Sequence, residues 1–180
     1  MTPTSRKSAT KPTRLTKPSR LTADQNAENG FHASEELCGS LQRVLVDLVE
    51  LQVQGKQAHW NVVGPNFRDT HLQLDEIVEA ARRLGDTIAE RMRALHAVPD
   101  GRSSTVSTTT SLESYPLGEV LTTDTVDLIT ARLESVIATV RDVHDAVDEE
   151  DPTTADILHV VLETLEQFAW MVSAENRTPA

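Results

Sequence analysis

Prolines divide this chain into long segments whose apolar residues recur with helical spacing. Proline lacks a backbone N–H and clashes with the preceding turn, so it is excluded from helix interiors. The prolines beyond residue 20 are Pro65, Pro99, Pro116, Pro152 and Pro179. Between them the apolar spacing predicts helices over residues 34–62, 66–97, 124–151 and 152–175.

Short polar residues stand where these helices are predicted to begin. We expect Ser34, Asn66 and Asp124 to act as N-caps, with Pro152 in the first turn of the last helix. The connections are short, long and short, and the long one, residues 98–123, has room for a short helix. A long middle connection lets the chain cross the bundle. The pattern predicts an all-α protein, a ferritin-like four-helix bundle with one long crossover carrying a short helix.

The composition excludes several other classes. A single cysteine, Cys38, rules out an internal disulfide framework and favours a reducing compartment. No run approaches the roughly 18 apolar residues that cross a bilayer, so we expect no membrane partner. The chain has only two tryptophans, one tyrosine and three phenylalanines, which argues against a β-sandwich. The core is therefore expected to consist of Leu, Val, Ile and Ala.

Charge is distributed unevenly along the chain. Residues 1–20 carry +6 and no acid, whereas the remaining 160 residues carry −17. The six cations are Arg6, Lys7, Lys11, Arg14, Lys17 and Arg20. We expect a basic, largely disordered arm over residues 1–33, the bundle over 34–175 and a short tail over 176–180. A solvated tail, a transit peptide and a DNA contact remain as interpretations of the arm.

Two polar pairs in the second helix point to a metal site. His71 and Asp75 share one helix face, and so do Asp86 and Glu90. Imidazole and carboxylate ligands together suit iron, zinc or manganese. The pairs lie roughly 22 Å apart along the helix axis, too far to share an ion within one chain. Two copies of the helix crossing antiparallel about a two-fold axis would bring them together.

A di-iron centre inside a single bundle has poor support. Such centres use a Glu-x-x-His motif from each of two helices. None of the six histidines has Glu three residues before it, and the nearest match is Asp156-x-x-His159.

One stretch connects these residues to a known family. It comprises Lys56–Phe67, which contains His-Trp-Asn-Val-Val-Gly-Pro, followed by His71, Asp75 and Asp86–Arg91. Further matches are Ser114–Leu117, Thr154–Leu158 and Trp170. Over residues 34–175 the chain resembles the Dps family, the DNA-protecting mini-ferritins of starved cells.

The resemblance implies a hollow dodecamer with iron-oxidising sites at its two-fold interfaces. The implied iron ligands are His59, His71 and Asp75 from one subunit, with Asp86 and Glu90 from its partner. Trp60 matches a tryptophan beside the site; by itself it would be read as a core residue. The family further implies hydrogen peroxide as oxidant, with oxygen slower, storage of Fe(III), and a cytoplasmic, nucleoid-associated protein.

Other residues receive secondary roles. Glu76 and Glu79 are candidates for mineral nucleation, and Asp156 matches an acid near the family's three-fold pores. The remaining histidines, His32, His96, His144 and His159, are expected to be surface or packing residues. DNA would be bound without sequence specificity through the arm. Two alternatives stay open: a structural oligomer that binds metal without redox turnover, and a purely DNA-binding nucleoid protein.

Overall fold

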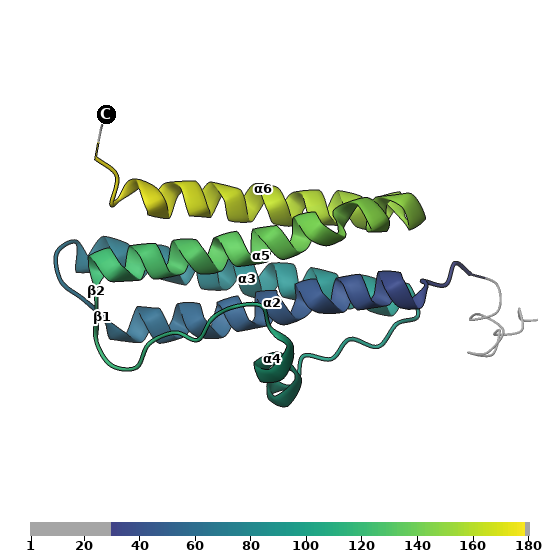
Figure 1. The fold of residues 1–180 in the computed structure, drawn as a ribbon, viewed down its shortest axis with the longest axis horizontal. Helices are drawn as coiled ribbons and strands as arrows, with labels where there is room; N and C mark the ends of the chain where they lie inside the picture. The colour runs from purple at the N-terminus through teal and green to yellow at the C-terminus, as the bar shows by residue number, and fades with distance from the viewer. Residues whose placement is uncertain (1–29, 179–180) are drawn as a thin grey trace, which may run out of the picture. The chain divides into compact units, whose positions relative to one another are not determined.

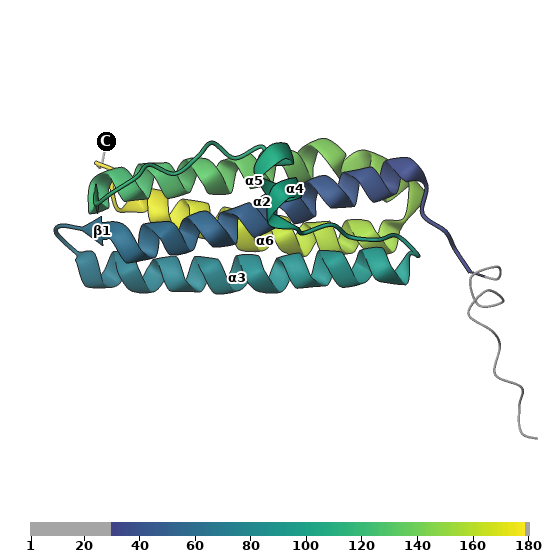
Figure 2. The same ribbon diagram turned by 90° about the horizontal axis from the view of Figure 1, so that it is seen from below.

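Four long helices lie side by side in the part of the chain that the computed structural model describes, residues 30–178 (Figures 1 and 2). They are α2 (Glu35–Asn61), α3 (Phe67–Ala94), α5 (Thr122–Glu150) and α6 (Pro152–Ala174). A short helix, α4 (Ser103–Thr109), stands in the long connection. α2 packs antiparallel against α3, and α5 packs in the same way against α6. The four-helix bundle with one long crossover is therefore confirmed.

The crossover ends in a short strand that determines where α5 begins. β2 (Val120–Leu121) pairs in parallel with β1 (Val62–Val63), which directly follows α2. This pairing holds residues 120 and 121 extended, and the helix starts immediately afterwards at the buried Thr122. The prediction that Asp124 caps this helix is wrong. Asp124 lies within the first turn, where its charge still favours the helix dipole.

The other two predicted caps had different outcomes. Ser34 caps α2 as expected, because its Oγ accepts a hydrogen bond from Leu37 N at 3.0 Å. It also ties the start of α2 to the end of α5, donating from N and Oγ to the Glu150 carboxylate. Asn66 precedes α3 but adopts a left-handed conformation, φ 58°, and its side chain makes no capping hydrogen bond.

The core consists of aliphatic side chains, as the composition predicted. Leu, Val, Ile, Ala and one Met form the buried hydrophobic cluster of the described residues. The six aromatic side chains are all partly or fully exposed there, and Trp60 is 69% exposed. Reading Trp60 as a core residue is therefore wrong.

Buried polar side chains fasten the crossover to the bundle. Asp47 of α2 accepts hydrogen bonds from Ser111 N, Ser111 Oγ, Thr110 Oγ1 and Thr139 Oγ1, at 2.7–3.0 Å. Arg132 of α5 donates to Gln54 Oε1 and to the carbonyl oxygen of Ser114. Because unpaired buried polar groups are costly, these partners fix the path of residues 110–114.

A partly buried ion pair joins α3 to the turn between α5 and α6. Arg91 donates to Asp151 Oδ2 at 2.6 Å and to Thr154 Oγ1 at 2.8 Å. Burial alone would raise the pKa of Asp151, but hydrogen bonds from Thr154 and Arg91 outweigh it and lower the pKa below its ordinary value. Folding therefore favours the ionised carboxylate.

Arg91→Met is expected to lower the free energy of unfolding by about 1–3 kcal/mol at neutral pH, the usual range for a hydrogen bond to a charged group. The lowered pKa stabilises the fold above the unfolded Asp pKa of about 3.9, and this contribution disappears as the pH falls through the folded value. The difference in Tm between the wild type and the Arg91→Met variant should therefore become smaller in acid. A difference in Tm that does not change with pH would show that lost packing, and not the lost charge, destabilises the variant.

Residues 31–178 belong to one compact unit that contains the bundle. Within the described residues, no helix is long and apolar enough to span a membrane. The six cations of the predicted arm, Arg6 to Arg20, lie outside the described residues. The boundary between residues 33 and 34 stays a prediction.

Candidate metal centre

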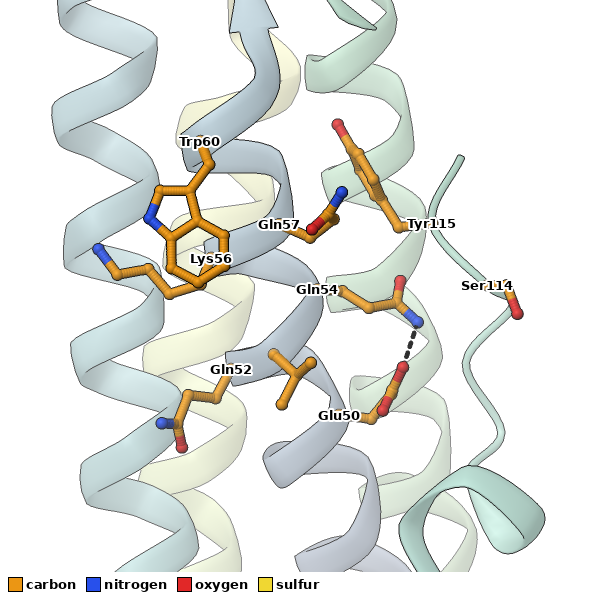
Figure 3. Close-up of a pocket in the computed structure, with 9 residues that line it drawn as sticks. Glu50, Gln52, Gln54, Lys56, Gln57, Trp60, Ser114 and Tyr115 are labelled. Carbon is orange, nitrogen blue, oxygen red and sulfur yellow. Dashed lines mark hydrogen bonds between the residues drawn. The ribbon is translucent and has the colours of Figure 1, made fainter. Parts of the chain in front are cut away.

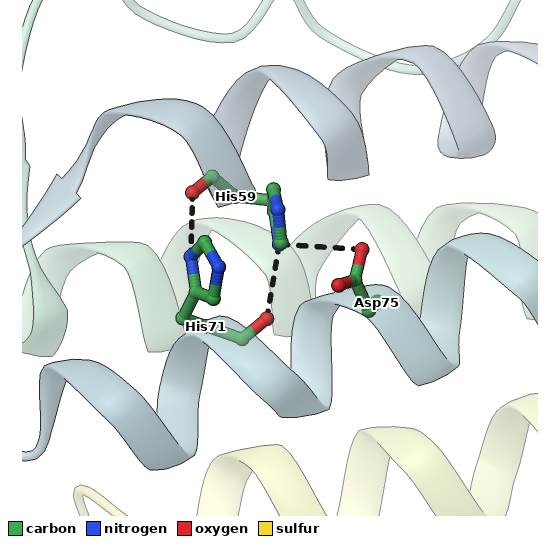
Figure 4. Close-up of side chains that lie close together, drawn as sticks. All are labelled: His59, His71 and Asp75. Atoms are coloured by element: carbon green, nitrogen blue, oxygen red, sulfur yellow. Dashed lines mark hydrogen bonds and ion pairs between the residues drawn. The ribbon is translucent and has the colours of Figure 1, made fainter.

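Three ligand-type side chains converge where α2 turns into α3. His59 is in the last turn of α2, while His71 and Asp75 lie on one face of α3 (Figure 4). One ligand atom from each of the three lies within 4.8 Å of the others. The chain reverses between the helices through Gly64, whose φ of +120° suits glycine. His59 and His71 face each other because each stands six residues from Pro65, the next residue of this turn.

The two histidines hold each other in a defined orientation. His59 Nδ1 lies 3.0 Å from the carbonyl oxygen of His71, and His71 Nδ1 lies 3.0 Å from the carbonyl oxygen of His59. Their rings stack with centroids 3.6 Å apart. A carbonyl oxygen only accepts, so each Nδ1 carries the proton and each Nε2 keeps its lone pair for a metal. Metal-binding histidines are commonly oriented in this way.

Asp75 has a cationic neighbour that the sequence reasoning missed. Lys56 Nζ lies 2.5 Å from Asp75 Oδ1, and His59 Nδ1 lies 3.3 Å from the same oxygen. The hydrogen bond from Lys56, supported by the two histidines, lowers the pKa of Asp75 below its ordinary value. Lys56 precedes His59 by one helical turn, so the spacing places it on the same face of α2, but the contact with Asp75 runs between two helices.

Asp86 and Glu90 do not join this cluster within one chain. Both are exposed on α3, which continues unbroken past them, so Asp86 lies roughly 22 Å along the axis from His71. The cluster of one chain could therefore offer three ligand atoms to a metal ion, without Asp86 and Glu90.

Trp60 lies beside the cluster but points out of the bundle. It lines a hollow of about 490 Å³ on the outer face of α2, together with Val53, Lys56, Gln57 and Tyr115 (Figure 3). Trp60 directly follows His59 in the chain, which is consistent with the prediction that it lies near the metal site.

The residues predicted for mineral nucleation and for the pore all lie on the surface of the bundle. Glu76 and Glu79 are exposed and line a second hollow that also contains Asp75. Glu79 pairs with Arg82 at 2.6 Å, so part of its charge is already compensated. Asp156 is exposed near the start of α6, with Oδ1 3.6 Å from His159 Nδ1.

Lys56→Met is expected to strengthen binding of Co(II), a probe for the site, up to about fivefold. The ammonium competes for the Asp75 carboxylate, and a pair of this exposure is worth about 0.2–1 kcal/mol. Lys56→Arg keeps the cation and should leave the affinity close to that of the wild type. Cobalt absorption titrations measure both. Equal affinities for the Met and Arg variants would show that the cation does not compete.

A family model described as the ferritin-like domain matches residues 38–178. The chain is 35% identical over 144 residues to the DNA protection during starvation protein of Agrobacterium fabrum, covering 79% of this chain and 89% of that protein.

Two solved structures share both fold and sequence. Dps92 of Deinococcus radiodurans superposes with a TM-score of 0.77 at 32% identity, covering 81% of this chain and 88% of that chain. Dps of Microbacterium arborescens in its high-iron form superposes with a TM-score of 0.75 at 31% identity, covering 81% and 98%.

Proposed function

The chain belongs to the Dps family of ferritin-like proteins, and on this premise we propose that it oxidises Fe(II), stores the resulting Fe(III) and protects DNA. The observation that carries the proposal is the cluster of His59, His71 and Asp75, whose imidazole and carboxylate donors suit iron.

The centre is completed by a second copy of the chain. Asp86 and Glu90 of the partner subunit would face His59, His71 and Asp75 across a two-fold axis, because one α3 cannot bring them together. Exposed apolar side chains on α2 and α3, at Val53, Trp60, Phe67 and Leu72, support this contact. In such a contact these side chains would be removed from water, which is favourable for apolar surface.

Iron is the substrate of this centre. Two Fe(II) ions each lose one electron, and hydrogen peroxide accepts both. Its O–O bond breaks, and two protons complete two water molecules. Because both electrons leave together, no hydroxyl radical is released. The roles of this chain are to hold the ions through Nε2 of the histidines and through the carboxylates, and to fix their separation.

Storage requires a closed shell. We propose twelve copies, with a total mass of about 240 kDa from a chain of 19.8 kDa. Residues 21–180 carry −17 per chain, and this charge attracts ferrous ions. Asp156 would line a pore for iron, while Glu76 and Glu79 would help to nucleate the mineral inside.

The proposed DNA protection would require the protein to bind DNA and would place it at the nucleoid. The six cations of residues 1–20 are the local excess of positive charge in an otherwise acidic chain. They would contact phosphates without reading sequence, since phosphate contacts carry no base information.

Stopped-flow oxidation of Fe(II) by the assembled protein tests the proposed function. We expect two Fe(II) ions to be consumed for each peroxide, with the Fe(III) absorbance eluting with the protein on gel filtration. One Fe(II) per peroxide, or Fe(III) precipitating outside the protein, would contradict the proposal. Zinc binding without any Fe(III) formation would favour the non-redox alternative.

A further inference from the structure

A second histidine pair lies at the end of the bundle where α5 turns into α6, opposite the end that carries β1 (Figure 1). His144 Nε2 and His159 Nε2 are 2.8 Å apart, and their ring centroids are 4.7 Å apart. The pair lines a hollow of about 190 Å³ together with Arg141, Asp145 and Leu162. The proposed iron centre does not use it.

Each of these histidines turns its other ring nitrogen toward a carboxylate. His144 Nδ1 lies 3.1 Å from Asp145 Oδ1, and His159 Nδ1 lies 3.6 Å from Asp156 Oδ1. A carboxylate only accepts, so Nδ1 of His144 carries the proton and its Nε2 keeps a lone pair. Asp156 approaches Nδ1 of His159 at ion-pair distance, which favours positive charge at that ring. The 2.8 Å between the two Nε2 atoms therefore requires either a proton on Nε2 of His159 or another cation between the rings.

We propose that His144 and His159 bind a divalent transition-metal ion of the zinc type between their Nε2 atoms. The order carboxylate, histidine, metal is the usual arrangement around metal-ligating histidines, because the carboxylate fixes the tautomer and raises the basicity of the ring. The pair supplies two nitrogen ligands from two helices. Water from the adjacent hollow completes the coordination.

The geometry needs only a small adjustment to accept the ion. Zinc binds imidazole nitrogen at about 2.0–2.1 Å, which places two such nitrogens about 3.3 Å apart in a tetrahedral site. The rings must therefore separate by about 0.5 Å. The side chain of His159 is 58% exposed and has room to move.

The charges around the pair favour a cation. Asp145 and Asp156 are highly exposed acids that face it. Arg141 is the cation that the described residues contribute to the hollow, and it is paired with Glu166 of α6, so its charge is compensated. A shared proton is the competing occupant, and zinc binding decides between the two.

Zinc titration by calorimetry on the full-length assembled protein tests the site. Wild type should bind one more zinc per chain than the His144→Asn/His159→Asn variant. Asp145→Asn/Asp156→Asn keeps both ligands, and its affinity at this site should fall about 10–100-fold, the usual cost of losing outer-shell carboxylates. Asp148→Asn removes an exposed carboxylate from the same helix and should bind zinc like the wild type.

Diffraction at the zinc edge locates the ion directly. We expect anomalous density between the two rings, about 2.0–2.1 Å from each Nε2, in addition to any zinc at His59 and His71. No density between the rings, or equal zinc stoichiometry in wild type and the double-histidine variant, would overturn the proposal and assign the contact to a shared proton. Unchanged Fe(II) oxidation in the His144→Asn/His159→Asn variant would show that the zinc site is separate from the proposed iron centre.

Discussion

His59→Ala combined with Asp86→Ala is expected to slow peroxide-dependent Fe(II) oxidation by more than about 100-fold. Outer-shell changes at metal sites already cost about 10–100-fold, and this variant removes one ligand from each half of the proposed centre. Stopped-flow measurement of Fe(III) absorbance reports the rate. Asp148→Ala, which removes an exposed acid on α5, is the matched control and should retain the wild-type rate.

The same variant is expected to remain a folded oligomer. Asp86 is exposed, and His59 stacks on His71 at the edge of the core, so little apolar burial is lost. Removing one of several clustered carboxylates also relieves repulsion in the metal-free protein. Unchanged fast oxidation would show that the site has been assigned to the wrong residues. Collapse of the oligomer would show that these side chains hold the interface.

Mixing two inactive variants tests whether the centre spans two chains. His71→Ala destroys the histidine half, and Glu90→Ala destroys the acidic half. In oligomers reassembled at random from equal amounts, about one quarter of the sites combine an intact histidine half with an intact acidic half across the two-fold axis. About a quarter of wild-type activity should therefore return. A centre contained within one chain would recover nothing.

The helices could be predicted because their determinants are local. Apolar spacing between prolines located all four long helices to within three residues at each end. α5 starts two residues before the predicted position. Its start depends on the pairing of Val120 and Leu121 with Val62 and Val63, which lie far away in the chain. No local pattern reports such a pairing.

The two histidine pairs show what the sequence contained and what was overlooked. His59 and His71 each stand six residues from Pro65, and His144 and His159 each stand seven residues from the turn at Asp151 and Pro152. Equal distances from a tight turn place two residues opposite each other in an antiparallel helix pair. The resemblance to Dps drew attention to the first pair, whereas the second was expected to consist of ordinary surface residues.

The details of the candidate site depend on side-chain placement. Spacing put Lys56 one turn from His59 but did not show that its ammonium reaches Asp75, since that contact runs between α2 and α3. The exposure of Trp60 follows from which face of α2 the core covers. Conversely, the separation of Asp86 from His71 required only the rise per residue of a helix, so the prediction of a site shared between two chains could be made from the sequence alone.

Removal of residues 1–20 is expected to abolish DNA binding. The remaining chain carries −17 and should repel phosphate, whereas the removed segment carries six cations and no acid. Protein–DNA affinity depends largely on neutralised phosphates and released counterions. If all six cations of one arm contact phosphates, affinity should fall about 10³-fold between 50 and 200 mM salt. Several arms on one shell would strengthen binding by multivalency.

Three proteins distinguish charge from chain length in a gel-shift assay at low and moderate salt. They are the full chain, a chain beginning at Leu21, and a full-length variant with Arg6, Lys7, Lys11, Arg14, Lys17 and Arg20 replaced by Gln. The Gln variant keeps the length of the arm and loses its charge, so it should fail to bind just as the truncated chain does. Residues 1–20 contain no aromatic side chain for base stacking, so binding should be independent of DNA sequence. A truncated shell that binds as well as the full chain, or binding indifferent to salt, would place the DNA contact elsewhere on the shell.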